Sequence, residues 1–309
     1  MIVPTRRGGA GLERLLTSLA GSAAETIVVD NASGDPGLAR LGDRDGIEVV
    51  ALERNEGFGR AVNRAARRAG GDALVVLNDD MVVAPGYVDE LCARLDPAAG
   101  VVMAAGVMCE PGADGRIDTA GIEIDRSLQI FDYLNGEPLA ALAGAADPIG
   151  PSGGAAAFDR DAFLAVGGFD ERLFAYWEDA DLALRLHEAG GRCRLARTAR
   201  GVHEHSATLG SGSPRKNYLM GFGRGFVVRK WGALSLRRAA PIVARDAAIC
   251  AGQAVVDRNL AGVRGRVAGF RAASRERAYP RGAVEASAAP GALGDLARRA
   301  RRRRRLRRR

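Results

Sequence analysis

Residues 74–81 read Leu74-Val75-Val76-Leu77-Asn78-Asp79-Asp80-Met81, so four apolar residues run directly into two adjacent carboxylates. An uninterrupted apolar run of this length is typical of a strand that is buried on both faces. Open α/β sheets bind their ligands at the carboxyl ends of such strands, which is where Asp79 and Asp80 fall. Neighbouring carboxylates repel each other, and a divalent cation with a preference for oxygen ligands would relieve that repulsion. A solvated Asp-Asp turn is the alternative interpretation.

Three further strands precede this run, and helical connections join them. The expected elements are strands at 1–5, 26–29 and 48–52 and helices at 11–20 and 57–69. Strands that alternate with helices predict an α/β fold with a parallel sheet and right-handed crossovers. That arrangement places Thr5, Asp30 and Asn55 along the same sheet edge as Asp79 and Asp80. The convergence of polar residues favours a binding site at this edge.

The part of the chain after residue 81 supplies further candidates. Residues 110–147 show weak periodicity, and we expect loops and short strands there that cover the site. Gly153 and Gly154 permit close approach of the backbone to a ligand, although a plain turn would also use them. His203 follows a short strand. It is either a structural histidine or, as neutral imidazole beside two aspartates, a third metal ligand.

A helix expected to begin near Glu178 carries three acids in its first turn: Glu178, Asp179 and Asp181. Capping and a favourable interaction with the helix dipole explain acids at this position. The alternative is that one of them is a general base. A helix N-terminus favours the ionised carboxylate, which is the form in which a base must start.

Composition limits the class of protein. Hydrophobic residues make up 47% and charged residues 27% of the 309 residues, as in a globular protein. The formal charge of +8 is concentrated, because residues 298–309 contain ten arginines and no acid, which leaves about −2 for the rest. The four cysteines form no CxxC pair, which argues against a zinc site or a disulfide framework and fits a reduced cytosol.

We expect neither a signal peptide nor a membrane span. The best apolar candidate for a span, residues 239–256, is interrupted by Arg245 and Asp246. The first strand is unusually short, so we expect it to begin upstream of Met1.

The chain divides into three expected regions. These are a catalytic domain over 1–210, a basic helical extension over 211–280, and a disordered Arg-rich tail over 281–309. Basic arms bind nucleic acid through its phosphates, but this tail lacks interleaved aromatic residues. We therefore expect no nucleic-acid partner and predict that the tail meets anionic lipid headgroups.

Six short motifs, in order, resemble one family. They are Val3-Pro4-Thr5-Arg6, Val29-Asp30-Asn31-Ala32-Ser33, Arg54-Asn55-Glu56-Gly57-Phe58-Gly59, Leu77-Asn78-Asp79-Asp80-Met81, Gly167-Gly168-Phe169-Asp170-Glu171 and Trp177-Glu178-Asp179-Ala180-Asp181-Leu182. Each motif alone is weak, but the ordered set over about residues 1–210 resembles glycosyltransferase family 2, especially its bacterial rhamnosyltransferase-like members.

This resemblance implies a GT-A fold, with a mostly parallel Rossmann-like sheet flanked by helices, and an inverting transfer from a nucleotide-diphosphate sugar. It also implies Mg²⁺ or Mn²⁺ as the cofactor. The Asn-Asp-Asp order leaves open which aspartate ligates the metal. The implied roles are nucleobase binding by Asp30, Pro4 and Thr5; ribose and metal contact by Asp79; metal ligation by Asp80 and His203; general base by Asp179; sugar and acceptor contact by Gly153 and Gly154; and further substrate contact by Asn55, Trp177 and Glu178.

The expected function is transfer from a dTDP- or UDP-sugar, with rhamnose as the candidate sugar, to a cell-envelope polysaccharide or a lipid-linked acceptor. We expect the enzyme in the cytoplasm, peripheral on the inner face of the cell membrane. A dinucleotide-binding enzyme is disfavoured, because Val62 stands where its fingerprint needs a third glycine. A nucleotidyltransferase would need a Gly-rich basic loop, which residues 5–11 only partly imitate. A non-catalytic binding module would not need both Asp80 and Asp179.

Overall fold

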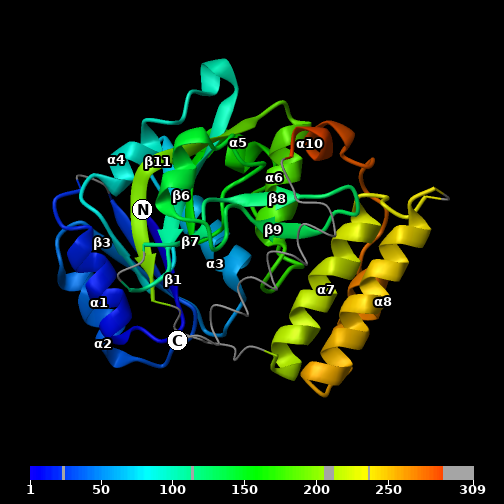
Figure 1. Ribbon diagram of the computed structural model, residues 1–309. Helices are drawn as coiled ribbons and strands as arrows, with labels where there is room; N and C mark the ends of the chain where they lie inside the picture. Colours follow the sequence, from blue (N-terminus) through cyan, green and yellow to red (C-terminus); the bar gives the residue numbers. More distant parts are fainter. Residues whose placement is uncertain (23–24, 113–114, 205–211, 236, 288–309) are drawn as a thin grey trace.

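The α/β fold expected from the sequence is confirmed by a computed structural model, which describes residues 1–22, 25–112, 115–204, 212–235 and 237–287 (Figure 1). The main sheet contains the strands β1 (Ile2–Thr5), β2 (Thr26–Asp30), β3 (Ile47–Ala51), β4 (Ala73–Leu77), β5 (Met81–Val83), β6 (Val101–Cys109), β7 (Ile117–Thr119), β10 (Ala155–Asp159) and β11 (Arg192–His203). Two short strands, β8 (Ile122–Ile124) and β9 (Ile130–Asp132), form a separate hairpin.

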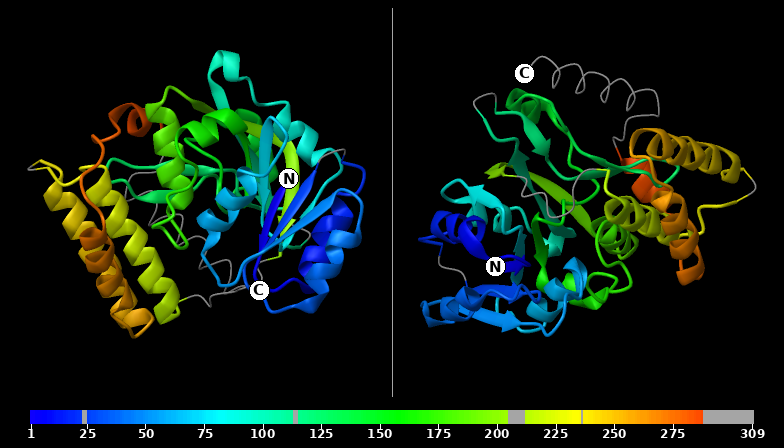
Figure 2. Two further views of the ribbon diagram at one scale, coloured as in Figure 1. Left: turned by 180° about the vertical axis from the view of Figure 1, so that it is seen from behind. Right: turned by 90° about the horizontal axis from the view of Figure 1, so that it is seen from below.

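Helices cover both faces of the sheet (Figures 1 and 2). They are α1 (Gly9–Ser18), α2 (Pro36–Ala39), α3 (Phe58–Ala66), α4 (Tyr87–Cys92), α5 (Arg160–Ala165), α6 (Glu178–Glu188), α7 (Pro214–Lys230), α8 (Ala239–Val256), α9 (Ala261–Ala272) and α10 (Arg281–Ala286), with short 3₁₀ turns at Arg40–Asp43, Pro97–Ala99 and Leu139–Gly144. Helices α1, α2 and α4 pack on one face of the sheet, and α3, α5 and α6 pack on the other.

The sheet is mixed, with the strand order β3-β2-β1-β4-β10-β6-β11-β5 and with β7 paired to β6. The first four strands are parallel, as predicted. Beyond them the sheet is mixed: β6 and β11 pair in parallel, whereas β10 runs antiparallel to both β4 and β6 and β5 runs antiparallel to β11. Strand β10 enters from the candidate site edge, just after Gly153 and Gly154, and runs back through the middle of the sheet.

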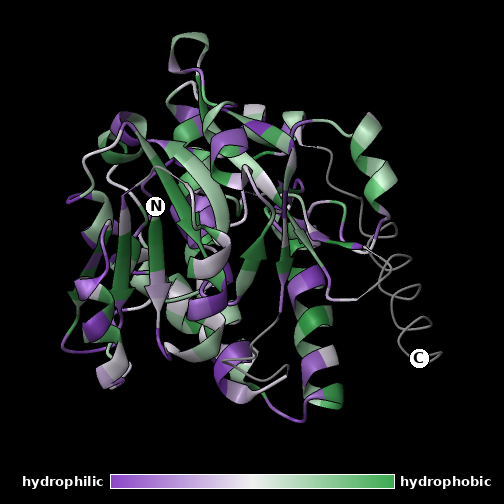
Figure 3. Ribbon diagram, turned by 90° about the vertical axis from the view of Figure 1, so that its left-hand side faces the viewer, coloured by the Kyte–Doolittle hydropathy of each residue, from purple (hydrophilic) through white to green (hydrophobic). Residues whose placement is uncertain are grey.

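Strand β4 is buried on both faces, as its apolar run predicts. Leu74 and Val76 belong to the core on one side of the sheet, and Val75 and Leu77 belong to the core on the other. All four side chains are at most 2% exposed. Figure 3 shows the strands of the central sheet largely in the hydrophobic colour, in agreement with their burial.

The helical extension shares the core of the catalytic part. Val227, Val228 and Trp231, at the end of α7, belong to the same apolar cluster as strand β4. The division into domains at residues 210 and 280 stays a prediction. Disorder from residue 281 was wrong for the first residues of that stretch, because helix α10 buries Ala283 and Val284 in this cluster. The Arg-rich residues 288–309 lie outside the described part of the chain.

Helix α8 passes a test of length and composition that the sequence analysis expected it to fail, and whether it crosses a membrane stays a prediction. Among the described residues, α8 is the one helix long and apolar enough to cross a membrane by length and composition, with a mean hydropathy of 1.3. Arg245 and Asp246 do not interrupt it, because both pair with the body of the protein: Arg245 with Asp125, and Asp246 with Arg224.

Candidate active site

The carboxyl ends of β1, β2 and β4 meet at one edge, as the sequence predicts. The Thr5 hydroxyl donates to Oδ2 of Asp79 at 2.5 Å and accepts from the Gly8 amide at 3.0 Å. Asp30 pairs with Thr5 in the parallel register of β1 and β2. Burial raises the pKa of Asp79, the Thr5 hydrogen bond opposes that rise, and the charge of Asp80 adds to it. Asp79 is therefore fixed by its neighbours, and Asp80 lies beyond it.

Asp80 and His203 lie together, although 122 residues separate them in sequence. Strand β11 pairs with β5 so that His203 lies opposite Met81, and the Glu204 amide donates to the Asp80 carbonyl at 2.9 Å. Nε2 of His203 is 3.2 Å from Oδ1 of Asp80. The sequence predicted these two residues as partners in one site, and the structure brings them together.

Asp118 is a site residue that the sequence analysis missed. Its Oδ2 lies 2.9 Å from Nδ1 of His203, on the side of the ring away from Asp80. Burial alone would lower the pKa of His203, but hydrogen bonds with Asp118 and Asp80 outweigh it and raise the pKa to about 9. Asp118 lies in β7, inside the stretch that lacks clear periodicity, so no local pattern identified it.

The first turn of α6 carries the predicted base. Oδ1 of Asp179 accepts from the Ala180 amide at 2.8 Å, and the Gly153 amide also donates to this carboxylate. Burial raises the pKa of Asp179 against these donors. Burial and the charge of Asp179 raise the pKa of Glu178 to about 8. Glu178 is buried and Asp179 only half-buried, so we assign the proton of the pair to Glu178 and the negative charge to Asp179.

Backbone strain precedes this helix. Tyr176 and Trp177 have φ values of 70° and 76°, which is uncommon for large side chains and costs free energy. The Trp177 side chain is 3% exposed. It lies against Gly223 of α7, where a Cβ would overlap the indole, and the Arg224 guanidinium lies 5.6 Å from the ring centroid. This packing holds the strained turn before Asp179, and the predicted contact of Trp177 with substrate stays a prediction.

The loop before α3 is held by asparagines. Asn55, a predicted substrate contact, accepts from the Gly57 amide at 3.0 Å through its own Oδ1. Asn31, which we had not singled out, is buried, donates to the Gly57 carbonyl at 3.0 Å and accepts from the Glu56 amide at 2.8 Å. Asn31 therefore fixes this loop to the end of β2.

The remaining predicted residues lie at the same edge. Pro4 is half-buried in β1, and Oδ1 of Asp30 accepts from the Ser33 amide at 2.7 Å. Gly154 packs on Asn78 so closely that a Cβ would overlap its amide, which explains this glycine by packing. A Cβ on Gly153 would lie 3.7 Å from the Asp179 Cβ. The backbone of Gly153 therefore borders the candidate base.

A family model described as "Glycosyl transferase family 2" matches residues 1–166, which is more than half of the chain. The chain belongs to glycosyltransferase family 2. The match covers the sheet edge with Thr5, Asp30, Asp79 and Asp80, whereas α6 and His203 lie beyond it.

Relatives of this family 2 member include two proteins of Mycobacterium tuberculosis. A "Pre-mycofactocin glycosyltransferase" is 28% identical over 234 residues, which cover 74% of this chain and 47% of the relative. This chain thus spans about half the length of that relative. An "N-acetylglucosaminyl-diphospho-decaprenol L-rhamnosyltransferase" is 28% identical over 240 residues, covering 68% of this chain and 77% of the relative.

Solved structures confirm the GT-A fold of this family 2 member. GalNAc-T7 with UDP, GalNAc and Mn²⁺ superposes with a TM-score of 0.59 at 19% identity, over 74% of this chain and 47% of that one. The mannosyltransferase PcManGT of Pyrobaculum calidifontis, in complex with GDP-Man and Mn²⁺, gives 0.53 at 20% identity, over 88% and 75%. At these identities the likeness concerns the fold alone.

Two residues of this family 2 member fit a divalent cation. A carboxylate and an imidazole, Asp80 and His203, face each other across 3.2 Å. The raised pKa of His203 keeps a proton on the ring, which would be released on binding a cation. Asp118 holds the far nitrogen of the ring, which is how carboxylates orient a metal-binding histidine. In the described part of the chain no third His, Cys, Asp or Glu completes a ready-made cluster. The pair therefore fits an ion that substrate phosphates and water also ligate.

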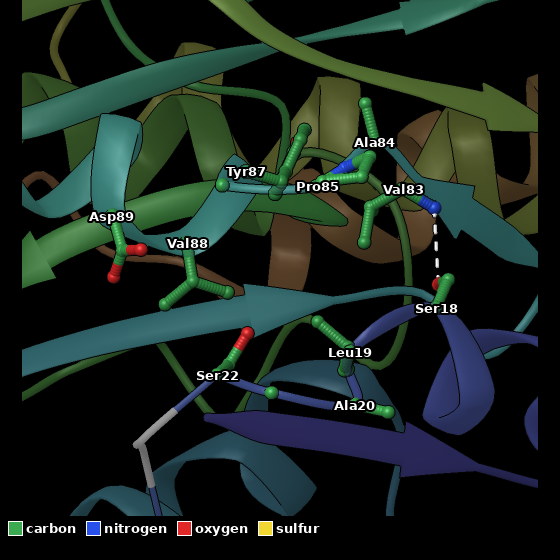
Figure 4. Close-up of a pocket in the computed structure, with 12 residues that line it drawn as sticks. Ser18, Leu19, Ala20, Ser22, Val83, Ala84, Pro85, Tyr87, Val88 and Asp89 are labelled. Atoms are coloured by element: carbon green, nitrogen blue, oxygen red, sulfur yellow. Dashed lines mark hydrogen bonds between the residues drawn. The ribbon is translucent and has the colours of Figure 1, made fainter.

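A separate hollow of about 180 Å³ lies where the end of α1 meets the start of α4 (Figure 4). Ser18 accepts from the Val83 amide at its rim at 3.2 Å. None of the predicted site residues lines this hollow. It is at the opposite end of α1 from the candidate site, and we assign it no part in the chemistry.

Proposed function

We propose that this chain is a metal-dependent, inverting glycosyltransferase that moves a sugar from a dTDP- or UDP-sugar to an acceptor hydroxyl. The observation that carries the proposal is the meeting of two groups of residues at one sheet edge. Asp80 and His203 form one group, and Asp179 against Gly153 forms the other. The first group is suited to bind a metal-bound diphosphate. The second group is suited to take the proton from an acceptor hydroxyl.

The proposed reaction is a single displacement. The acceptor oxygen forms a bond to the anomeric carbon while the bond from that carbon to the diphosphate oxygen breaks, and the nucleoside diphosphate leaves with the electron pair. The acceptor proton passes to Asp179, and general-base help of this kind is worth roughly 10²–10⁴-fold in rate. A bound cation, held by Asp80 and His203, would neutralise the charge that develops on the leaving group. Attack opposite the leaving group inverts the anomeric centre.

The acceptor that we propose is a cell-envelope polysaccharide or a lipid-linked sugar, and rhamnose is the proposed donor sugar. The support is the printed name of one relative, which couples an L-rhamnosyl group with a diphospho-decaprenol lipid. Identity of 28% over most of this chain makes the same class of substrates the first to try.

Calorimetry with UDP, dTDP and GDP, each with Mn²⁺, Mg²⁺ or EDTA, tests the proposal. We expect one nucleotide to bind in a metal-dependent way and binding to be lost in Asp80→Ala. Asp118→Asn is expected to weaken it roughly 10–100-fold, because outer partners of metal ligands contribute that much. Asp179→Asn serves as the control, since it should bind the nucleotide normally but transfer no sugar at a measurable rate. Metal-independent binding, or no binding of any nucleotide, would contradict the proposal.

A further inference from the structure

The outer face of α8 carries no charged or polar side chain. Ten exposed residues form this α8 face: Ala240, Pro241, Val243, Ala244, Ala247, Ala248, Ala251, Gly252, Val255 and Val256. Val243, Val255 and Val256 are 57%, 77% and 64% exposed. A helix of this length is roughly 27 Å long, so the face is a continuous apolar strip, and strips of this kind on a protein surface mark interaction sites.

The charges of α8 point toward the protein. Arg245 forms an ion pair with Asp125, and Asp246 accepts from Nε of Arg224 at 3.0 Å. A surface helix of a globular protein usually buries its apolar side and exposes its polar side. Helix α8 departs from this pattern, because it contacts the body through Ile242 and its two charged residues and leaves most of its apolar residues outside.

Exposed apolar residues also occur on α9 and in the turn before it, together with exposed arginines. Leu260, Val263 and Val267 are 58%, 39% and 45% exposed. Exposed arginines lie beside this surface: Arg237 and Arg258 flank the two ends of α8, and Arg264 and Arg271 lie on α9. The combination is an apolar strip with guanidinium groups along its edges.

The excess of basic residues in the helical extension favours an anionic partner for the α8 face. Residues 206–275 contain thirteen lysines and arginines but only two acids, Asp246 and Asp257. Asp246 pairs with Arg224, and Asp257 accepts from the Asn217 amide at 2.9 Å. Lys230 and Arg245 are paired with Asp170 and Asp125, so the basic character of the surface comes from exposed arginines such as Arg237, Arg258, Arg264 and Arg271. Basic surfaces of this kind attract anionic lipid headgroups. The cores of protein interfaces are enriched in aromatic residues and methionine, and the α8 face has neither, which argues against a second protein as the occupant.

We propose that the α8 face docks on an anionic membrane, with α8 in the plane of the headgroups, its valines inserted and the flanking arginines on lipid phosphates. In-plane helices bind by this combination of apolar area and basic charge. Helix α8 does not leave the body to span the bilayer, because that would unpair Arg224, which is 1% exposed.

The end of α8 lies close to the candidate site, with the start of α7 between them. Asn217, at the start of α7, donates to Asp257 at the end of α8. The ammonium group of Lys216 lies 5.8 Å from the ring centroid of Tyr176, in the strained turn before Asp179. The end of α8 is thus one layer from that turn. The docking rests on the surface alone and does not depend on the proposed reaction, although it would suit a lipid-linked acceptor.

Co-sedimentation of the full chain with vesicles tests the docking. We would compare phosphatidylcholine vesicles with vesicles that contain about one-third phosphatidylglycerol, since the attraction requires anionic headgroups. We expect binding to the anionic vesicles alone. Ala248→Glu with Val255→Glu places two charges on the α8 face and should lower binding at least tenfold. Arg237→Gln with Arg258→Gln keeps the apolar strip and should lower binding on the order of tenfold.

The matched control is Ala20→Glu with Ala39→Glu, which adds the same charge at exposed positions at the end of α1 and in α2, on the opposite side of the molecule (Figure 1). It should bind within about twofold of the unmodified chain, allowing for the charge it adds. Unchanged binding by Ala248→Glu with Val255→Glu would overturn the proposal and assign membrane binding to the Arg-rich tail. A dimer that this variant dissociates would instead assign the face to a second copy. Binding that resists both high salt and alkaline carbonate would indicate a span.

Discussion

Glu178 and Asp179 are neighbours in the chain, yet their side chains meet different surroundings. Glu178 is 8% exposed and its Oε2 lacks a hydrogen-bond partner within the described residues, whereas Asp179 is only half-buried and accepts two backbone hydrogen bonds. Two adjacent carboxylates in a site of low polarity do not both ionise readily, so one holds a proton. The buried member thereby keeps the accessible one available as a base.

This division predicts a pH-dependent stability. The pKa of Glu178 is raised from 4.5 to about 8 in the folded state, so the folded protein holds a proton that the unfolded chain has released. The favourable contribution is complete below pH 4.5 and is lost as the pH rises through 8. We expect the free energy of unfolding to fall by at least about 1 kcal/mol between pH 5 and 9, since one pKa unit corresponds to about 1.4 kcal/mol.

Urea unfolding at several pH values measures this dependence. Glu178→Gln should make it shallower, because the amide cannot titrate, while the raised pKa of His203 leaves a residual fall in stability as the pH rises toward 9. Glu285→Gln, which removes an exposed carboxyl in α10, should leave it as in the unmodified chain. Equal slopes for both variants and the unmodified protein would show that Glu178 does not carry the effect.

At the scale of the elements, α7 and α9 pack through glycines. A Cβ on Gly269 would overlap the carbonyl of Phe222, one on Gly265 would overlap that of Tyr218, and one on Gly225 would overlap that of Arg266. The two helices therefore approach each other backbone to backbone. A side chain at any of these positions would force them apart.

Gly269→Ala is expected to destabilise the protein by about 1–3 kcal/mol through this overlap. Gly252→Ala is the matched control, because Gly252 lies inside α8 and a Cβ there meets nothing within 4 Å. It should instead stabilise the helix by roughly 0.5–1 kcal/mol. Thermal unfolding of the two variants tests whether α7 and α9 pack through glycines. A similar shift of the melting temperature in both variants would contradict it.

Features that depend on neighbouring residues were predictable from the sequence, and features that depend on distant contacts were not. Strand β4 and helix α6 were predictable because their apolar and charged residues repeat at short range. Asp118 and Asn31 were not, because each acts on a residue far away in the chain, and only the strand pairing brings them there. Helix α10 was missed for a similar reason: its composition is that of a flexible tail, and burial of Ala283 and Val284 against the distant core gives it structure.

At the scale of the whole molecule, a buried charge network joins the helical extension to helix α6. Nζ of Lys230, at the end of α7, lies 2.7 Å from Asp170 and 2.8 Å from Asp181, which is fully buried in α6. Asp181 also accepts from the Trp231 indole at 3.0 Å. The helix that carries the candidate base is thus fixed directly to the helical extension.

Lys230→Met should lower the free energy of unfolding by about 3–5 kcal/mol, because it leaves buried carboxylates without a partner. Arg264→Met, on the exposed side of α9, should change it by less than about 0.5 kcal/mol. Urea unfolding followed by near- and far-ultraviolet circular dichroism should show one transition for the unmodified chain. Two separate transitions would mean that the extension folds independently.

The contact between Ser287 and Glu123 has a consequence for synthesis of the chain. The Ser287 hydroxyl donates to Glu123 across 164 residues of sequence, and ribosomes add roughly 5–20 residues per second. Strand β8 pairs with β9 soon after its own translation, but Ser287 is made on the order of 10–30 seconds later. During that interval we expect the apolar surface that later receives Ala283 and Val284 to be exposed on the nascent chain.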